Sequence, residues 1–363
     1  MRIIIKTFIE YLALVITIGL FTTCGGIKSI SGKPEVVDDK YFNYQYEKIY
    51  DYYVIKAWSG LDKPLPAYTP EMVTRHTELV GKLPWVMPTK SGDKKMLIGR
   101  TKGWPKNQNW PEDPEIPPQN IYGYQITDPG VMDGKVKMVV TCGNHATEFT
   151  GSWLLEGMIN FLAGSDPRAV FLRKKVIFYV YPDLNPEGRY MAVHRINLKA
   201  APDPNEGTDL RKRGNPELYS AGEPDHNRVW TTKERFSTIS ILTAAMKKDM
   251  EGHADYLWDI HGPQEPGNWR TPVDEARTNN YAIALMKLEP EVIRCGPESG
   301  FKIKVASGPP GKLSLWAASK EGLNVTYPYV YEPGGWTEER LKEAGRNLEL
   351  ALYDILSDET SIK

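Results

Sequence analysis

A histidine and a glutamate stand three residues apart where an apolar segment gives way to a helical pattern. They are His145 and Glu148 in TCGNHATEFTGSW, which follows the β-branched run KVKMVV and precedes LLEGMINFLAG. An imidazole nitrogen and a carboxylate oxygen are both ligands that zinc takes in proteins. A His-x-x-Glu motif is too short to establish a metal site by itself, so the rest of the chain must supply further ligands.

A catalytic zinc site needs three protein ligands and one open position for water. His261 is the best candidate for the third ligand, because it directly follows the apolar segment ADYLWDI. The other histidines are interpreted differently. His253 is expected to face solvent, His76 belongs to a polar helix, and His194 and His226 are candidates for lining the cleft.

Strand and helix patterns alternate along most of the chain. The strand patterns are MLIGRT, NIYGYQIT, KVKMVVTC, KKVIFYVYP, ADYLWDIHG and VTYPYVYEP; the helical patterns are TPEMVTRHTELVGKL, GSWLLEGMINFLAG, RFSTISILTAAMKKDM, NNYAIALMKLEPEVIR and TEERLKEAGRNLELALYDIL. This alternation predicts an α/β fold with a mixed, largely parallel central sheet and helices on both faces. Ligands of such sheets bind at the carboxyl ends of the strands, where His145, Asn185 and His261 are expected.

The overall composition is that of an ordinary globular protein. The chain has 363 residues, of which 41% are hydrophobic and 25% charged, and its formal net charge is −1. With so little net charge, and no basic tract with interleaved aromatic residues, we expect no nucleic-acid partner.

Residues 1–24 are typical of an export signal. A positive start precedes the apolar stretch FIEYLALVITIGLF, and TTCGG follows. The pattern resembles a bacterial lipoprotein signal, in which Cys24 would be lipidated and would anchor the protein to a membrane. Phe21 and Thr23 depart from the residues that such signals favour, so a plain secretory signal or a membrane anchor stays open. In each case we expect a periplasmic or cell-surface protein, with residues 25–40 as a tether.

The two remaining cysteines, Cys142 and Cys295, are far too few for a disulfide scaffold. Whether they pair is left open. Cys142 is interpreted as a small core residue at a strand end rather than as a nucleophile.

Six short motifs in a fixed order resemble the zinc carboxypeptidase family, the carboxypeptidase A-like metallopeptidases. They are GNHATE, LNPEG, HRIN, DHNRVW, DIHG and YVYEPGG, and the match runs from about residue 70 to the end. The resemblance implies one zinc ion held by His145, Glu148 and His261. It also implies a single catalytic domain, which we place at residues 41–363.

The resemblance also implies how the other motifs act. Glu332 would be the general base that takes a proton from water and passes it to the leaving amine. Arg195 would stabilise the oxyanion with a fixed positive charge. Asn227 and Arg228 would hold the C-terminal carboxylate of a peptide substrate, a task that suits the bidentate guanidinium.

Glu338 and Glu339 are rivals for the role of the base. Both are expected in the first turn of a helix, where the helix dipole alone accounts for acidic residues. Glu332 is therefore the better candidate.

The chain departs from the family pattern in places that concern the substrate. LNPEG replaces Asn-Pro-Asp-Gly, a long polar stretch separates HRIN from DHNR, and SGPPGKLSLWAASKEG lacks the tyrosine that is frequent there. The favoured hypothesis is a zinc metallocarboxypeptidase that hydrolyses C-terminal peptide bonds. A zinc amidase, deacylase or cell-wall peptide hydrolase of the same fold stays open. A non-catalytic zinc-binding protein would be expected to have lost a ligand or Glu332, and neither is lost.

Overall fold

The computed structural model describes the chain from Tyr68 onward with gaps. The described residues are 68–103, 116–130, 133–146, 148–190, 219–220, 223–224, 226–231, 237–262, 268–271, 276–289, 304–305, 311–333 and 336–361. The expected signal at residues 1–24, the tether at 25–40, Arg195, His194 and Cys295 lie outside them.

Among these residues, eight strands form one central sheet in the order β1-β4-β6-β5-β9-β12-β10-β11. They are β1 (Val86–Pro88), β4 (Tyr124–Ile126), β5 (Val136–Cys142), β6 (Val176–Tyr181), β9 (Tyr256–Ile260), β10 (Asn268–Thr271), β11 (Lys304–Val305) and β12 (Tyr327–Glu332). The four central strands β6, β5, β9 and β12 are parallel, and β4 and β10 pair with them antiparallel. The prediction of a mixed, largely parallel sheet is confirmed. Two further strand pairs form separate two-stranded sheets: β2 (Leu97–Arg100) with β3 (Asn120–Tyr122), and β7 (Tyr219–Ser220) with β8 (Glu223–Pro224).

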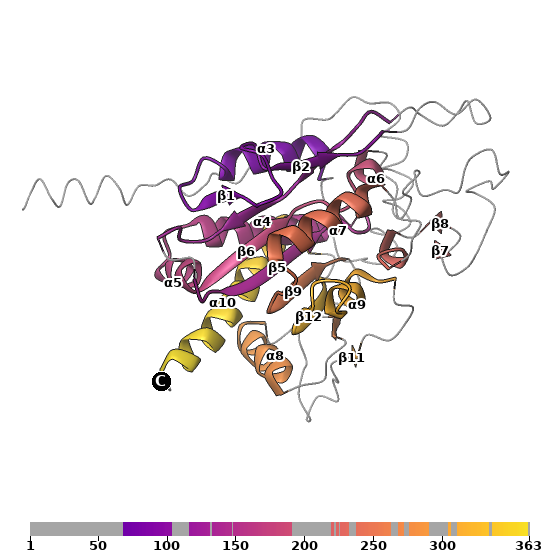
Figure 1. Cartoon of the computed structure of the whole chain (residues 1–363). Coiled ribbons are helices and arrows are strands. Elements are labelled where there is room, and N and C mark those ends of the chain that lie inside the picture. The colour runs from indigo at the N-terminus through magenta and orange to yellow at the C-terminus, as the bar shows by residue number, and fades with distance from the viewer. Residues whose placement is uncertain are drawn as a thin grey trace, which may run out of the picture.

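Helices cover both faces of the central sheet (Figure 1). The core on one face contains residues of α4 (Phe149–Ala163), α5 (Pro167–Lys175), α8 (Ala276–Leu288) and α10 (Glu338–Ser361), and the core on the other contains residues of α7 (Ser237–Met250) and α9 (Leu313–Ala318). A third cluster joins α3 (Pro70–Val80) to the start of α4 and of α10.

Successive side chains of the central strands enter the two cores alternately. In β9, Trp258 and Ile260 pack on the side of α4, and Leu257 packs on the side of α7. Because helices cover both faces, such strands are apolar throughout, and all six residues of β6 are buried. The same period of two places Asp259 and His261 on the side of α7.

Two glycines allow α4 and α10 to come into close contact. A Cβ atom on Gly157 would lie 2.1 Å from the carbonyl oxygen of Lys342, and one on Gly345 would lie 2.0 Å from that of Leu154. Any larger residue at either position would push the helices apart. The contact fixes α4, whose first residue directly follows Glu148.

The predicted helices and strands in the described segments are confirmed, with shifts at their ends. NIYGYQIT, predicted as one strand, is divided at Gly123 into β3 and β4. The short helix α5 was not predicted. Asp166 caps it by accepting a hydrogen bond from the amide of Arg168, and Pro167 occupies its first turn. A helix of nine residues shows too few turns for a clear apolar period.

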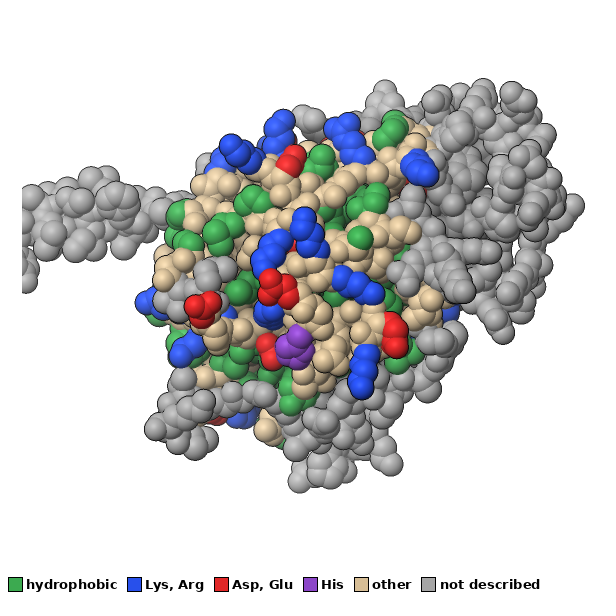
Figure 2. All heavy atoms as spheres, viewed as in Figure 1, with side chains coloured by type: hydrophobic (Ala, Val, Ile, Leu, Met, Phe, Trp, Pro, Cys, Tyr) green, Lys and Arg blue, Asp and Glu red, His purple; other side chains and the backbone are tan. Residues whose placement is uncertain are grey.

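Lysine and arginine side chains are spread over the face shown in Figure 2, with acidic side chains between them. This distribution agrees with the near-zero formal charge of the chain. None of the helices in the described segments combines the length and apolar composition needed to cross a bilayer.

Glu349 on α10 generates a prediction about stability and pH. Its side chain is fully buried, and neither oxygen has a hydrogen-bond partner in the described part of the chain. Burial raises the pKa of this carboxyl well above its usual value. A glutamate in an unfolded chain has a pKa of about 4.3, so folding takes up a proton above that pH. The free energy of unfolding therefore falls by about 1.4 kcal/mol per pH unit, up to the raised pKa.

We expect Glu349→Gln to be more stable than the wild type at pH 7, and the difference to shrink toward pH 4.5. Urea unfolding at both pH values measures it. Glu343→Gln, an exposed change on the same helix, should give no comparable gain. A Glu349→Gln variant that is less stable at pH 7 would show that a charged carboxylate is needed there.

Candidate metal centre

The pairing of β5 with β9 brings the two ligand-bearing segments to one edge of the sheet. Cys142, the last residue of β5, is the register partner of Ile260, the last residue of β9. His145 and Glu148 follow the first strand and His261 follows the second. The carboxyl ends of neighbouring parallel strands meet at this edge, as expected for an α/β sheet.

A buried ion pair supports the loop that carries His145. Arg189, in α6 (Pro186–Tyr190), donates from Nε to Asp183 Oδ2 over 2.9 Å and from Nη1 to the carbonyl oxygen of Tyr68 over 2.8 Å. Gly143 packs against this ion pair and has a φ of +78°. A Cβ atom at this position would lie 2.6 Å from an oxygen of Asp183 and 2.6 Å from a nitrogen of Arg189. The first residue after β5 must therefore be glycine for the loop to turn over Arg189.

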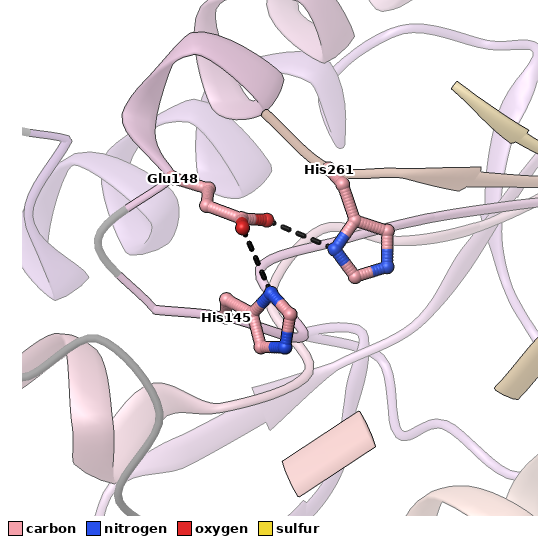
Figure 3. A group of neighbouring side chains, drawn as sticks. All are labelled: His145, Glu148 and His261. Atoms are coloured by element: carbon pink, nitrogen blue, oxygen red, sulfur yellow. Dashed lines mark hydrogen bonds and ion pairs between the residues drawn. The ribbon is translucent and has the colours of Figure 1, made fainter. Parts of the chain in front are cut away.

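Both imidazole rings present the same nitrogen to one carboxylate (Figure 3). His145 Nδ1 lies 2.8 Å from Glu148 Oε1, and His261 Nδ1 lies 2.9 Å from Glu148 Oε2. One ligand atom from each residue lies within 4.8 Å of the others, and all three side chains are buried. The expected ligand set is therefore assembled by the fold.

The electrostatics of the cluster favour a cation. Burial would raise the pKa of Glu148, but the positive charges of His145 and His261 outweigh it and hold that pKa below its usual range. Burial would likewise lower the pKa of His261, but the carboxylates of Asp259 and Glu148 raise it well above its usual value. Two imidazole nitrogens and one carboxylate form the donor set of catalytic zinc sites, so these residues fit zinc.

Two further residues surround the outer nitrogen of His261, and neither contact was predicted. Asp259 Oδ2 lies 3.1 Å from His261 Nε2, and Asn227 Nδ2 lies 3.3 Å from the same atom. The signal for Asp259 was present in the sequence as Asp-Ile-His, because two residues on a strand share a face. Nothing in the local sequence indicates the contact with Asn227, since it joins distant parts of the chain.

Glu332, the expected base, is the last residue of β12 and is buried. Tyr331 pairs with Ile260 across the parallel strands β12 and β9, and its carbonyl oxygen accepts a hydrogen bond of 2.9 Å from the amide of His261. Glu332 directly follows Tyr331, and His261 directly follows Ile260. The two residues therefore lie next to each other at the same edge of the sheet.

The residues expected to hold the substrate carboxylate lie in the short helix η4 (His226–Arg228). The Asn227 side chain is buried, and its Oδ1 accepts a hydrogen bond of 2.9 Å from the amide of Leu313 at the start of α9. Arg228 is partly exposed and donates from Nη1 to the carbonyl oxygen of Asn227 over 3.0 Å. Asn227 thus connects α9 to His261, and the predicted oxyanion residue Arg195 lies outside the described residues.

The other histidines are placed as follows. His226 is fully buried, and its Nδ1 lies 2.9 Å from Asn144 Oδ1, next to the ligand loop. His76 is buried in α3, whereas His253 is exposed as predicted. Cys142 is buried in the core beside Ser152, and burial raises the pKa of its thiol to about 11, which agrees with a structural role.

The cluster predicts how zinc binding responds to substitution. Loss of a residue that only hydrogen-bonds to a metal ligand can weaken metal binding by roughly 100-fold. Removing one of the three ligands themselves, as in Glu148→Gln or His261→Ala, should weaken zinc binding by more than that. Competition with a chromogenic chelator measures the affinity. His253→Ala, an exposed substitution, should bind zinc like the wild type. Equal affinity in Glu148→Gln and His253→Ala would place the metal elsewhere.

Comparisons with known proteins agree with this geometry. Residues 118–284 match the family model described as zinc carboxypeptidase. Cytosolic carboxypeptidase 2 of Xenopus tropicalis is 24% identical over 259 residues, which are 67% of this chain and 25% of that protein. Cytosolic carboxypeptidase 2 of Macaca fascicularis is 32% identical over 233 residues, which are 60% of this chain and 24% of that protein. The chain thus spans about a quarter of the length of these curated relatives.

Solved structures show the same fold. A metallo-carboxypeptidase from Burkholderia cenocepacia superposes with a TM-score of 0.56 at 16% identity, over 81% of this chain and 70% of that chain. Carboxypeptidase A from Helicoverpa armigera superposes with a TM-score of 0.52 at 14% identity, over 85% of this chain and 79% of that chain. The matched residues include His145, Glu148 and His261, the three potential zinc ligands that the sheet brings together. Over residues 118–284, the chain is therefore similar to the zinc carboxypeptidase family.

Proposed function

We propose that this chain is a zinc metallocarboxypeptidase that removes a C-terminal residue from peptides. The observation that supports this most strongly is the buried His145–Glu148–His261 cluster, with Glu332 ending the neighbouring strand, in a chain similar to the zinc carboxypeptidase family. A metal site and a carboxylate at one sheet edge are what amide hydrolysis requires.

When bound, zinc would act as a Lewis acid that polarises the carbonyl of the substrate and lowers the pKa of the attacking water. Glu332 accepts the proton of the attacking water and returns it to the leaving amine nitrogen. Arg195 provides the fixed positive charge for the developing oxyanion. The Arg228 guanidinium holds the terminal carboxylate of the peptide.

The side chain of Asn227 makes contacts within the protein. Its Oδ1 is engaged by the amide of Leu313, and its Nδ2 lies beside His261. This favours a second candidate function, a zinc amidase, deacylase or cell-wall peptide hydrolase. Such an enzyme would use the same ligands and Glu332 without needing a free peptide carboxylate.

Two peptides of identical sequence separate these functions. One ends in a free carboxylate and the other in a carboxamide. We expect the zinc-loaded protein to shorten the free peptide by one residue and to leave the amidated peptide largely intact, because only the carboxylate can pair with Arg228. Mass spectrometry of both reactions measures this. Equal cleavage of both peptides would overturn carboxylate recognition and support the second candidate.

Glu332→Gln tests whether Glu332 is the general base. It should keep its zinc and lose roughly 100-fold to 10,000-fold in turnover, the usual contribution of a general acid–base residue. Glu339→Gln, an exposed substitution at the start of α10, should retain turnover. Full activity in Glu332→Gln would assign the base to another residue.

We also propose that the protein is exported and held at a membrane through Cys24. The charged start, the apolar stretch and the Thr-Cys-Gly-Gly sequence support this, although the relatives above are cytosolic by name. In a bacterial host, we expect metabolic labelling with a fatty acid to mark the wild type and not Cys24→Ser. Unlabelled wild type in the soluble cytoplasmic fraction would refute export and lipidation together.

A further inference from the structure

Asp259 is a buried carboxylate behind the proposed metal centre. It is fully buried in β9, two residues before His261 and on the same side of the strand. Its Oδ2 lies 3.1 Å from His261 Nε2, and its Oδ1 lies 3.3 Å from the Thr141 hydroxyl on β5. The two carboxylate oxygens thus face two different strands.

The His261 ring has a different carboxylate at each nitrogen. Nδ1 faces Glu148, inside the ligand cluster, and Nε2 faces Asp259, outside it. A neutral imidazole carries one N–H, and the other nitrogen holds the lone pair that can bind a metal. A proton on Nε2 that is donated to Asp259 leaves the lone pair on Nδ1, directed at the cluster.

We propose that Asp259 is the positioning residue that fixes the tautomer and the orientation of His261 for zinc, a role that rests on the proposed zinc function. Metal-binding histidines commonly donate their second N–H to a carboxylate, which also increases the basicity of the ligand. Asp259 supplies that carboxylate from the same strand that carries the ligand.

Thr141 extends this arrangement to the second ligand-bearing strand. Thr141 and Asp259 are register partners across β5 and β9. The Thr141 hydroxyl lies 3.2 Å from the carbonyl oxygen of Trp258 and 3.3 Å from Asp259 Oδ1, so its single proton is shared between them. Asp259 therefore links His261 to the strand that leads to His145 and Glu148.

The experiment compares zinc affinity in the wild type, Asp259→Asn and Asp249→Asn by chelator competition. Asp249 is the matched control, because it is almost as buried and accepts a hydrogen bond of 2.7 Å from the Tyr181 hydroxyl, away from the ligands. We expect Asp259→Asn to bind zinc roughly 10-fold to 100-fold more weakly than the wild type. Asp249→Asn should match the wild type, even if both variants unfold at lower urea concentrations.

A spectroscopic measurement separates positioning from packing. In zinc-loaded protein with nitrogen-15-labelled histidine, the wild type should show a His261 Nε2–H that exchanges slowly with solvent. Asp259→Asn should shift this resonance and Asp249→Asn should not. An Nε2 without a proton in the zinc-loaded wild type would overturn the proposal, because zinc would then bind through the wrong nitrogen.

The outcomes distinguish this inference from the proposed function. A wild type that takes up no zinc would refute the proposed function itself. A wild type that binds zinc no more tightly than Asp259→Asn would refute the positioning role alone. Should Asp259→Asn fail to fold, Thr141→Val keeps the carboxylate and removes its shared hydrogen bond. We then expect about twofold to fivefold weaker zinc binding, and unchanged affinity would overturn the proposal.

Discussion

The parallel pairing of β5 with β9 is the constraint on which the site depends. With Cys142 opposite Ile260, His145, Glu148 and His261 emerge from one edge of the sheet and meet in one buried cluster. A shift of register by one residue would send His261 to the opposite face and separate the ligands. The site is therefore a property of the sheet rather than of its loops.

Other parts of the fold hold this edge in place. The Arg189–Asp183 ion pair lies under Gly143 and sets the turn that leads to His145. The close contact of α4 with α10 fixes the helix that begins directly after Glu148. Asn227 joins α9 to His261. Each ligand-bearing segment thus has a buried support of its own.

Much of this could be predicted from sequence because it is local or follows a simple period. The apolar runs identify the buried strands, and residues that directly follow them fall at the carboxyl edge, as His145 and His261 do. The contacts of Asn227 and Arg189 could not be predicted, because they join segments far apart in the chain. The contact of Asp259 with His261 is different, because Asp-Ile-His places both side chains on the same face of a strand and so makes it predictable.

We propose that one zinc ion binds to His145 Nδ1, His261 Nδ1 and a Glu148 oxygen. A crystal structure of the zinc-loaded protein, with anomalous data on either side of the zinc absorption edge, tests it most directly. A single zinc peak is predicted at about 2.0–2.2 Å from these three atoms. A zinc peak next to Nε2 of either histidine, or away from Glu148, would show that zinc is bound in another way.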